Sequence, residues 1–286
     1  MLIQKIRKSS RAKAYLALFT TSFVWGTTWV FSKAAVMEMP ALQMAAIRQF
    51  IAGLAMVAFF VFYKKLSLPS AKEFRWLFIM SLLLFVIANG FSTWGVTYIS
   101  SGLAALIGTL YPLSVVLIEA VFYKQKQIPS LAVFGLVLGL MGVGLVLYEN
   151  AFVNTGLHFG WGLVLSVLAM LSWSFGSVFL ARKKQTLNPY YSLGWQMLLS
   201  SVLLYILSLA LKQHIPIGAI SLKTWGIIIY LAALGSIIAF VAFLYTLKKL
   251  PQAIATLYAY INPLVAMFIG SWLLGETLNR YILGGA

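Results

Sequence analysis

The sequence predicts an all-α integral membrane protein, a ten-helix bundle made of two inverted five-helix repeats, with the tenth helix truncated in this sequence. Three observations predict this fold: long apolar runs, basic clusters that return after every second run, and an internal repeat. The chain is 62% hydrophobic and 9% charged, whereas soluble domains are about 25% charged. This composition excludes an ordinary soluble domain.

The basic residues gather in five short clusters between pairs of apolar runs. These clusters are Lys5/Arg7/Lys8/Arg11/Lys13, Lys64/Lys65/Lys72/Arg75, Lys124/Lys126, Arg182/Lys183/Lys184 and Lys248/Lys249. Basic residues near the ends of membrane helices are retained in the cytoplasm. The pattern therefore predicts a multi-pass protein whose amino terminus and even-to-odd connections are cytoplasmic.

The net charge of +16 does not indicate a nucleic-acid partner. The basic residues stand at predicted helix ends, where anionic lipid headgroups attract them. The expected partner is therefore the lipid bilayer. The chain has no cysteine, which removes disulfides, thiolate catalysis and Cys-metal sites from consideration.

A helix needs about 20 apolar residues to cross a bilayer. The apolar runs predict spans at residues 13–35, 41–63, 75–97, 101–123, 129–148, 160–181, 191–211, 224–247 and 252–274. Prolines mark the breaks between them, since the ring removes a hydrogen-bond donor and clashes with the preceding turn. These are Pro40, Pro69, Pro129, Pro189, Pro216 and Pro251. Residues 278–286 begin a further apolar segment that is too short to cross, and truncation of a tenth helix is favoured over a natural early end.

The two halves of the chain, residues 1–150 and 151–286, repeat each other. Trp25 corresponds to Trp173, and the Ala-rich run that leads to Pro112 corresponds to the run that leads to Pro263. Each repeat holds five spans, so the second copy enters the membrane in the opposite orientation. Inverted repeats with a binding site between them are the common plan of secondary transporters.

Residues 25–33, Trp-Gly-Thr-Thr-Trp-Val-Phe-Ser-Lys, resemble the first-helix signature of the drug/metabolite transporter superfamily, EamA type. Arg48, the runs before the two prolines, and Gly275-Glu276 before the last helix extend this resemblance over nearly the whole chain. It implies two EamA repeats (residues 1–150 and 151–286), a bacterial inner-membrane location and export of amino acids or related metabolites. Residues 123–126 depart from the family pattern, because the Gly-Glu motif is absent there.

Arg48 lies about two turns into the second span, counted from the outer side. Ionisable residues within a membrane span are expensive and usually functional. One interpretation gives its guanidinium the role of binding an anionic group such as a carboxylate. The other is structural, with the side chain paired to backbone carbonyls or extended to the outer interface.

Glu119 is the acidic residue placed deepest in an apolar run, near the cytoplasmic end of the fourth span. It differs from Arg48 in depth by roughly 16 Å at 1.5 Å per residue, so the two are not expected to pair. Glu119 either reaches the inner interface beside Lys124 or Lys126, or acts as a proton-coupling site. We favour the inert interpretation and keep Glu119 as the coupling candidate.

Other polar and aromatic side chains fall deep in the spans. Asn262 precedes Pro263, whose missing donor frees a carbonyl that is either satisfied locally or exposed to a binding region. Deep aromatic rings either pack the core or offer stacking and cation–π contacts. The candidate substrate-binding residues are therefore Trp25, Trp29, Arg48, Asn89, Trp94, Tyr111, Trp173, Gln196, Tyr258 and Asn262.

Several function classes are disfavoured. The chain has no Asp, five Glu and two His, so paired carboxylates and metal-ligand clusters are not expected, and no catalytic residue, metal or cofactor is predicted. A non-transporting membrane scaffold would not need deep Arg and Asn residues. Uptake of sugars, nucleotide-sugars or other metabolites remains an alternative to export. Glycines at 135, 139, 142 and 144 suit tight helix packing or a dimer contact, which leaves a monomer or a homodimer.

The topology is testable because the chain has no cysteine of its own. We expect a single cysteine at Gln125 to be protected from an impermeant thiol reagent applied outside whole cells, and to react once the membrane is opened. Labelling in intact cells would contradict the predicted orientation.

Overall fold

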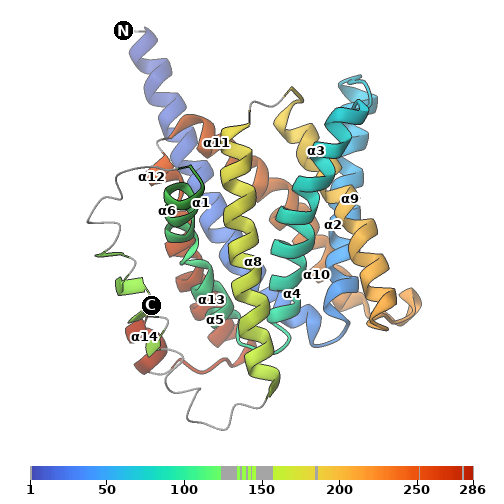
Figure 1. The fold of residues 1–286 in the computed structure, drawn as a ribbon, viewed down its shortest axis with the longest axis vertical. Coiled ribbons are helices and arrows are strands. Elements are labelled where there is room, and N and C mark those ends of the chain that lie inside the picture. The colour runs from blue at the N-terminus through green and yellow to red at the C-terminus, as the bar shows by residue number, and fades with distance from the viewer. Residues whose placement is uncertain are drawn as a thin grey trace.

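Long helices cross the molecule from end to end and alternate in direction along the chain (Figure 1). A computed structural model describes residues 2–123, 134–135, 137–139, 141–142, 144–145, 157–183, 186–250, 252–278 and 280–285. These residues form helices, turns and loops and no strand. The all-α fold is therefore confirmed.

Within the described residues, six helices are long and apolar enough to cross a membrane. They are Ala41–Tyr63, Ala71–Gly95, Ser101–Tyr123, His158–Arg182, Pro189–Ala210 and Leu222–Lys249. A shorter apolar helix, α13 (Tyr258–Leu274), follows them, and α1 (Leu2–Val36) contains the first predicted span. The predicted span 129–148 falls largely outside the described residues, as do Lys124, Lys126 and Lys184.

Two of these membrane-crossing helices change to wide π-helical turns at the same place in each repeat. In the first helix, the π-helical segment η2 (Leu82–Gly90) lies between α3 (Ala71–Ser81) and α4 (Phe91–Gly95). In the second helix, the π-helical segment η4 (Leu231–Ile238) lies between α10 (Leu222–Tyr230) and α11 (Ala239–Lys249). A third such turn, η1 (Phe59–Tyr63), ends α2 (Ala41–Ala58). Wide turns within α-helices are frequent at functional sites. These π-helical turns were not predicted from the sequence.

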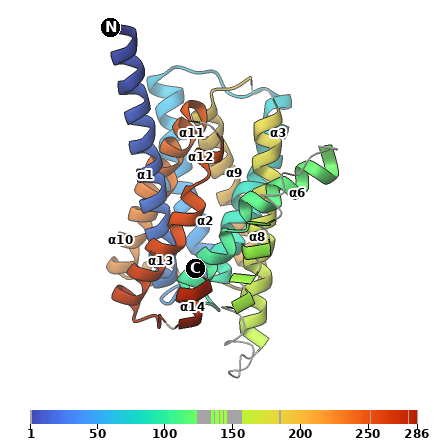
Figure 2. The ribbon, with the colours of Figure 1, turned by 90° about the vertical axis from the view of Figure 1, so that its left-hand side faces the viewer.

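The fourth and ninth spans are each interrupted once. A turn at residues 109–110 separates α5 (Ser101–Gly108) from α6 (Tyr111–Tyr123), and a turn at 256–257 separates α12 (Gln252–Ala255) from α13. The remaining elements are α8 (Leu157–Arg182), α9 (Pro189–Ala210), η3 (Ile217–Ala219) and the short α14 (Arg280–Gly285). Figure 2 shows α1 running beside α13, a pair that is in contact along the bundle.

Side-chain caps start several of these helices. Ser70 and Glu73 form a reciprocal capping box at the start of α3, and Asn188 accepts hydrogen bonds from Tyr190 N and Tyr191 N, with Pro189 at the first position of α9. Such caps satisfy amide groups that have no partner within the helix. The boundaries predicted from prolines are thus fixed in detail by Ser and Asn side chains.

Two glycines allow α2 and α9 to pack closely. A β-carbon on Gly53 would lie 2.6 Å from Leu198 N and 2.9 Å from Gly194 O, and one on Gly194 would lie 2.8 Å from Met56 Cβ. Because the nearest atoms to Gly53 are backbone, neither helix has a flexible group that moves aside. Small residues at such crossings are typical of membrane helices.

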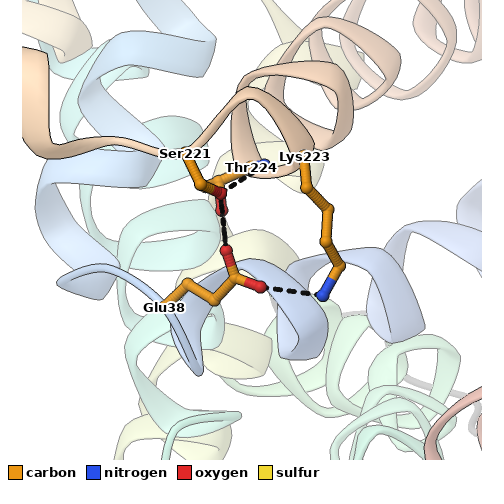
Figure 3. A network of polar contacts seen from close by, with 4 residues as sticks. All are labelled: Glu38, Ser221, Lys223 and Thr224. Atoms are coloured by element: carbon orange, nitrogen blue, oxygen red, sulfur yellow. Dashed lines mark hydrogen bonds and ion pairs between the residues drawn. The ribbon is translucent and has the colours of Figure 1, made fainter.

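At the end of α1 opposite the amino terminus, a polar network joins the two repeats (Figure 3). The carboxylate of Glu38 pairs with Lys223 Nζ at 2.8 Å and accepts hydrogen bonds from Ser221 Oγ, at 2.8 Å, and from Thr224 Oγ1. The hydrogen bond from Lys223, followed by those from Thr224 and Ser221, lowers the pKa of Glu38 to about 2. Glu38 therefore remains ionised at the start of α10, where a negative charge is favourable.

Lys33 and Glu276 hold the turn between α4 and α5 from opposite sides. Lys33 Nζ donates to Val96 O at 2.7 Å and to Ile99 O at 3.0 Å. Glu276 accepts from Ser101 N at 2.8 Å and from Ser101 Oγ at 2.7 Å. A cation thus satisfies the carbonyls that end one helix, and an anion satisfies the amides that begin the next. The Gly-Glu motif noted in the second half has a structural role across the repeats.

The glycines predicted for close packing between residues 135 and 144 behave differently from one another. A β-carbon on Gly142 would lie 2.5 Å from Gly285 O, so this glycine packs against α14 within the chain. Gly135 and Gly144 have no atom within 4 Å of such a carbon. A dimer contact through these residues stays a prediction.

The packing of α2 on α9 gives a stability test. We expect Gly53→Ala to reduce the free energy of unfolding by about 1–3 kcal/mol, the usual cost of an overpacked contact. Gly226→Ala in α10, where the added carbon meets nothing within 4 Å, is the matched control and should be neutral or stabilising, because alanine favours helices. Thermal unfolding in detergent measures both, and an undiminished unfolding temperature for Gly53→Ala would contradict the packing.

Candidate functional site

A cavity of about 160 Å³ lies between the two repeats. Repeat one contributes α1, α2, η2, α4, α5 and α6 to its wall, and repeat two contributes α8, α11 and α13. Eight of the ten candidate substrate-binding residues line it, namely Trp25, Trp29, Arg48, Asn89, Tyr111, Trp173, Tyr258 and Asn262. Their contact with a substrate stays a prediction.

The other two candidates do not line this cavity. Trp94 directs its ring toward Phe91 and Trp161, with ring centroids 6.3 and 6.4 Å away, whereas its neighbour Thr93 faces the cavity. Adjacent residues on a helix point about 100° apart. A shift of one residue along the helix therefore decides whether a side chain faces the cavity. Gln196 is buried in α9, a helix that packs along α2 and contributes no described residue to the lining.

Arg48 is buried in the cavity wall and has no acidic partner. Its side chain is 4% exposed, so it does not extend to the outer interface, which rules out that structural interpretation. Its Nε donates to Ser236 Oγ at 2.9 Å, and within the described residues the Arg48 side chain makes no other hydrogen bond. The ion pairs among the described residues are Arg182–Glu119 and Lys223–Glu38, and neither includes Arg48. Since a guanidinium has five N–H donors, most of its capacity remains for a ligand or water.

Helix α2 connects to both π-helical segments through adjacent side chains. Arg48 reaches η4 through Ser236, while Gln49 Nε2 donates to Asn89 Oδ1 in η2 at 2.9 Å. A β-carbon on Gly235, beside Ser236, would lie 3.1 Å from Arg48 Nη2, so the guanidinium rests directly on the backbone of η4. One turn of α2, which carries Arg48 and Gln49, therefore positions both Arg48 and Asn89 in the cavity wall.

Aromatic rings form another part of the wall, centred on Trp25. Its ring centroid lies 4.9 Å from Phe240, 5.0 Å from Tyr258 and 5.9 Å from Trp173, with edges toward faces. Trp25 Nε1 donates to Gly235 O at 3.0 Å, and Trp173 Nε1 donates to Tyr258 Oη at 3.3 Å. These bonds satisfy both indole N–H groups, as buried indoles require, while the Tyr258 hydroxyl accepts from Trp173 and keeps its own hydrogen to donate.

Asn262 is mainly a structural link. With its amide oriented to suit the surrounding carbonyls, Nδ2 donates to Ser22 O at 2.7 Å and to Tyr258 O at 3.0 Å. The residue thus ties α13 to α1 in the turn before Pro263, which lies inside α13. It also lines the cavity, and its contact with a substrate stays a prediction.

Three further residues at the site were not predicted from the sequence. Gln49 orients Asn89, Gly235 supports Arg48, and Ser166 places a buried Oγ without a hydrogen-bond partner in the cavity wall. A second polar residue beside Arg48, in the middle of an apolar span, was a usable signal for Gln49. Nothing in the sequence distinguished Gly235 or Ser166 from other small residues.

Glu119 lies away from the cavity. Its Oε1 pairs with Arg182 Nη2 at 3.0 Å, with both side chains partly exposed, and the Arg182 guanidinium stacks 3.9 Å from the Tyr123 ring centroid. Its partner is therefore an arginine of repeat two, and Lys124 and Lys126 lie outside the described residues. Its role in coupling stays a prediction.

The described residues contain no group of three or more His, Asp or Glu side chains able to hold a metal ion. Among the described residues that line the cavity, Arg48 is the single residue with a charged side chain. The site offers donors and aromatic surface and is suited to binding.

The EamA-like transporter family matches the chain twice, over residues 12–148 and 160–286. The chain is 32% identical over 268 residues to the inner membrane transporter YedA of Escherichia coli (strain K12), across 92% of this chain and 84% of that protein. It is 24% identical over 275 residues to the transporter YoaV of Bacillus subtilis (strain 168), across 96% and 93% of the two chains. A solved crystal structure superposes with a TM-score of 0.65 over 96% of this chain and 94% of the other at 17% identity, which supports the fold.

The close packing of Thr28 in α1 against Gly235 in η4 is testable by a paired substitution. A β-carbon at Gly235 would lie 2.7 Å from Thr28 Cγ2 and 3.1 Å from Arg48 Nη2, so Gly235→Ala should lower the free energy of unfolding by about 1–3 kcal/mol. Thr28→Ser removes the nearer atom, and adding it to Gly235→Ala should restore part of the loss. Thermal unfolding of the two single variants and the double variant measures this coupling. Purely additive losses would show that the two side chains do not meet as described.

Proposed function

The chain belongs to the EamA-like transporter family, and on that premise we propose that it exports amino acids or related small carboxylates across the cell inner membrane by alternating access. Transport by such proteins alternates between states in which one repeat moves against the other around a fixed site. The cavity lies between the two repeats and takes its lining from both. This placement supports a carrier that exposes one site to each side in turn.

The observation that carries the proposal is the buried Arg48 without an acidic partner. A charged group removed from water is costly unless it is paired. Within the described residues, Arg48 has no ion pair and donates one hydrogen bond, to Ser236. An anionic substrate would supply the missing partner, and the guanidinium geometry suits two parallel hydrogen bonds to one carboxylate.

The π-helical segments support movement of the repeats. Each lies at the middle of a span, and α2 joins them through Arg48–Ser236 and Gln49–Asn89. A substrate bound at Arg48 and Asn89 therefore contacts the side chains that fasten α2 to η2 and η4. Binding at that point changes the relative stability of the two arrangements, as a transported ligand must.

We also propose that the amino terminus and the basic links between spans are cytoplasmic. The partners are the bilayer and a small-molecule substrate, and the protein acts as a monomer or homodimer without a cofactor.

Uptake of a panel of labelled amino acids, other carboxylates and sugars into proteoliposomes tests the function. Saturable uptake of sugars alone would replace the proposed substrate class, and absence of saturable flux for every compound would favour a scaffold.

Variants of Arg48 separate charge from geometry. Arg48→Gln should weaken substrate binding by about 2–5 kcal/mol, the range for loss of one partner of a buried charge pair. Arg48→Lys keeps the charge and loses the planar fork, so it should recover only part of the activity. Arg182→Gln, which removes an exposed arginine away from the cavity, is the matched control. Wild-type transport by correctly inserted Arg48→Gln would assign Arg48 a structural role.

We expect Glu119→Gln to leave substrate transport and any substrate-linked proton movement unchanged, because Glu119 lies outside the cavity and pairs with Arg182. Counterflow and proton flux in proteoliposomes measure both quantities. Substrate-dependent proton flux that disappears in this variant would make Glu119 the coupling residue.

A further inference from the structure

We propose that the cavity selects monoanionic carboxylates with a compact apolar or aromatic body, and that an ammonium group on the same skeleton weakens binding. This inference rests on the proposed function and narrows its substrate class. It follows from the sign of the charges around the cavity, the polarity of the free hydrogen-bonding groups, and the character of the remaining wall.

No acidic residue that the structure describes faces the cavity. The chain has no Asp and five Glu. Glu38 pairs with Lys223, Glu119 pairs with Arg182, and Glu73 caps α3. Glu276 caps α5, and the fifth, Glu149, lies outside the described residues. A zwitterion therefore finds a partner for its carboxylate at Arg48 and no described carboxylate for its ammonium.

The polar groups beside Arg48 also favour an anion. The Oδ1 atom of Asn89 already accepts a hydrogen bond from Gln49 Nε2 at 2.9 Å. An amide has one oxygen and one NH₂ group, so the amide nitrogen of Asn89 is the group left to donate. Together with the free N–H groups of Arg48, it forms a donor-rich end of the cavity that matches the two oxygens of a carboxylate.

The aromatic part of the wall suits an apolar body, although hydroxyl groups such as those of Thr93 and Ser166 also line the cavity. Trp25 and Trp173 present indole rings whose N–H groups are occupied, by Gly235 O and by the Tyr258 hydroxyl respectively, and Tyr258 adds a third ring. The cavity volume of about 160 Å³ is similar to that of an engineered cavity of about 150 Å³ that holds benzene. One ring or a branched aliphatic group of similar size is therefore the body that fits.

An ammonium group in this setting meets unfavourable electrostatics. Aromatic faces attract a cation, but this attraction competes with the loss of its hydration and with repulsion from the guanidinium of Arg48 in a low-dielectric wall. Aromatic contact alone does not replace a carboxylate partner. Removing the ammonium from the ligand therefore removes a cost and loses no ion pair with the described residues.

Four ligands that share one skeleton test this inference on the purified full-length chain. Phenylpropionate carries the carboxylate alone, phenylalanine carries both charges, phenethylamine carries the ammonium alone, and phenylpropanamide carries neither. Equilibrium dialysis measures binding of radiolabelled phenylpropionate and its displacement by the other three. We expect phenylpropionate to bind about tenfold more tightly than phenylalanine, equivalent to ~1.4 kcal/mol, and the amine and the amide to displace it only weakly.

Variants and controls complete the experiment. Arg48→Gln should abolish the preference for phenylpropionate over phenylpropanamide, and the control Arg182→Gln should preserve it. Equal or tighter binding of phenylalanine would overturn the inference while leaving the proposed function intact. No saturable binding of phenylpropionate to the wild-type protein would also overturn it. Failure of the proposed function is read separately, as absence of saturable flux for every compound of the proteoliposome panel.

Discussion

The hydrogen bonds of Arg48 and Gln49 in α2 are the interactions on which the rest of the site depends. Arg48 reaches Ser236 in η4, and Gln49 reaches Asn89 in η2. These two contacts join the matching π-helical segments of the inverted repeats to one helix. They also place a guanidinium and an amide at the same end of the cavity. The proposed recognition of a ligand and the contacts between the repeats thus involve the same side chains.

The polar contacts at the two ends of the bundle differ between the two repeats. On one face, Glu276 of repeat two caps α5 of repeat one, and Lys33 satisfies the carbonyls that end α4. On the other, Glu119 pairs with Arg182 as partly exposed side chains. Exposed ion pairs contribute little to stability, whereas caps on helix ends satisfy groups that otherwise have no partner. The Gly-Glu motif of repeat two therefore provides a helix cap for repeat one.

Much of this architecture was predictable because membrane spans depend on length and hydrophobicity. The predicted spans 41–63 and 101–123 coincide with the helices Ala41–Tyr63 and Ser101–Tyr123. The depth of Arg48 was also predictable, because few charges occur within apolar runs. The π-helical turns were not, since they arise from packing and carry no proline. Trp94 and Gln196 are the two candidates that do not line the cavity, because the ring of Trp94 packs toward Trp161 and Gln196 is buried in α9, which packs along α2.

We propose that a buried guanidinium between the repeats binds the carboxylate of the substrate. An experimental structure of the protein with a para-brominated phenylpropionate bound, in which anomalous scattering locates the bromine, tests this binding mode directly. We expect carboxylate oxygens within hydrogen-bond distance of Arg48 and Asn89, and the brominated ring against Trp25, Trp173 and Tyr258. A ligand bound with its ring toward Arg48, or at a site outside this cavity, would contradict this binding mode.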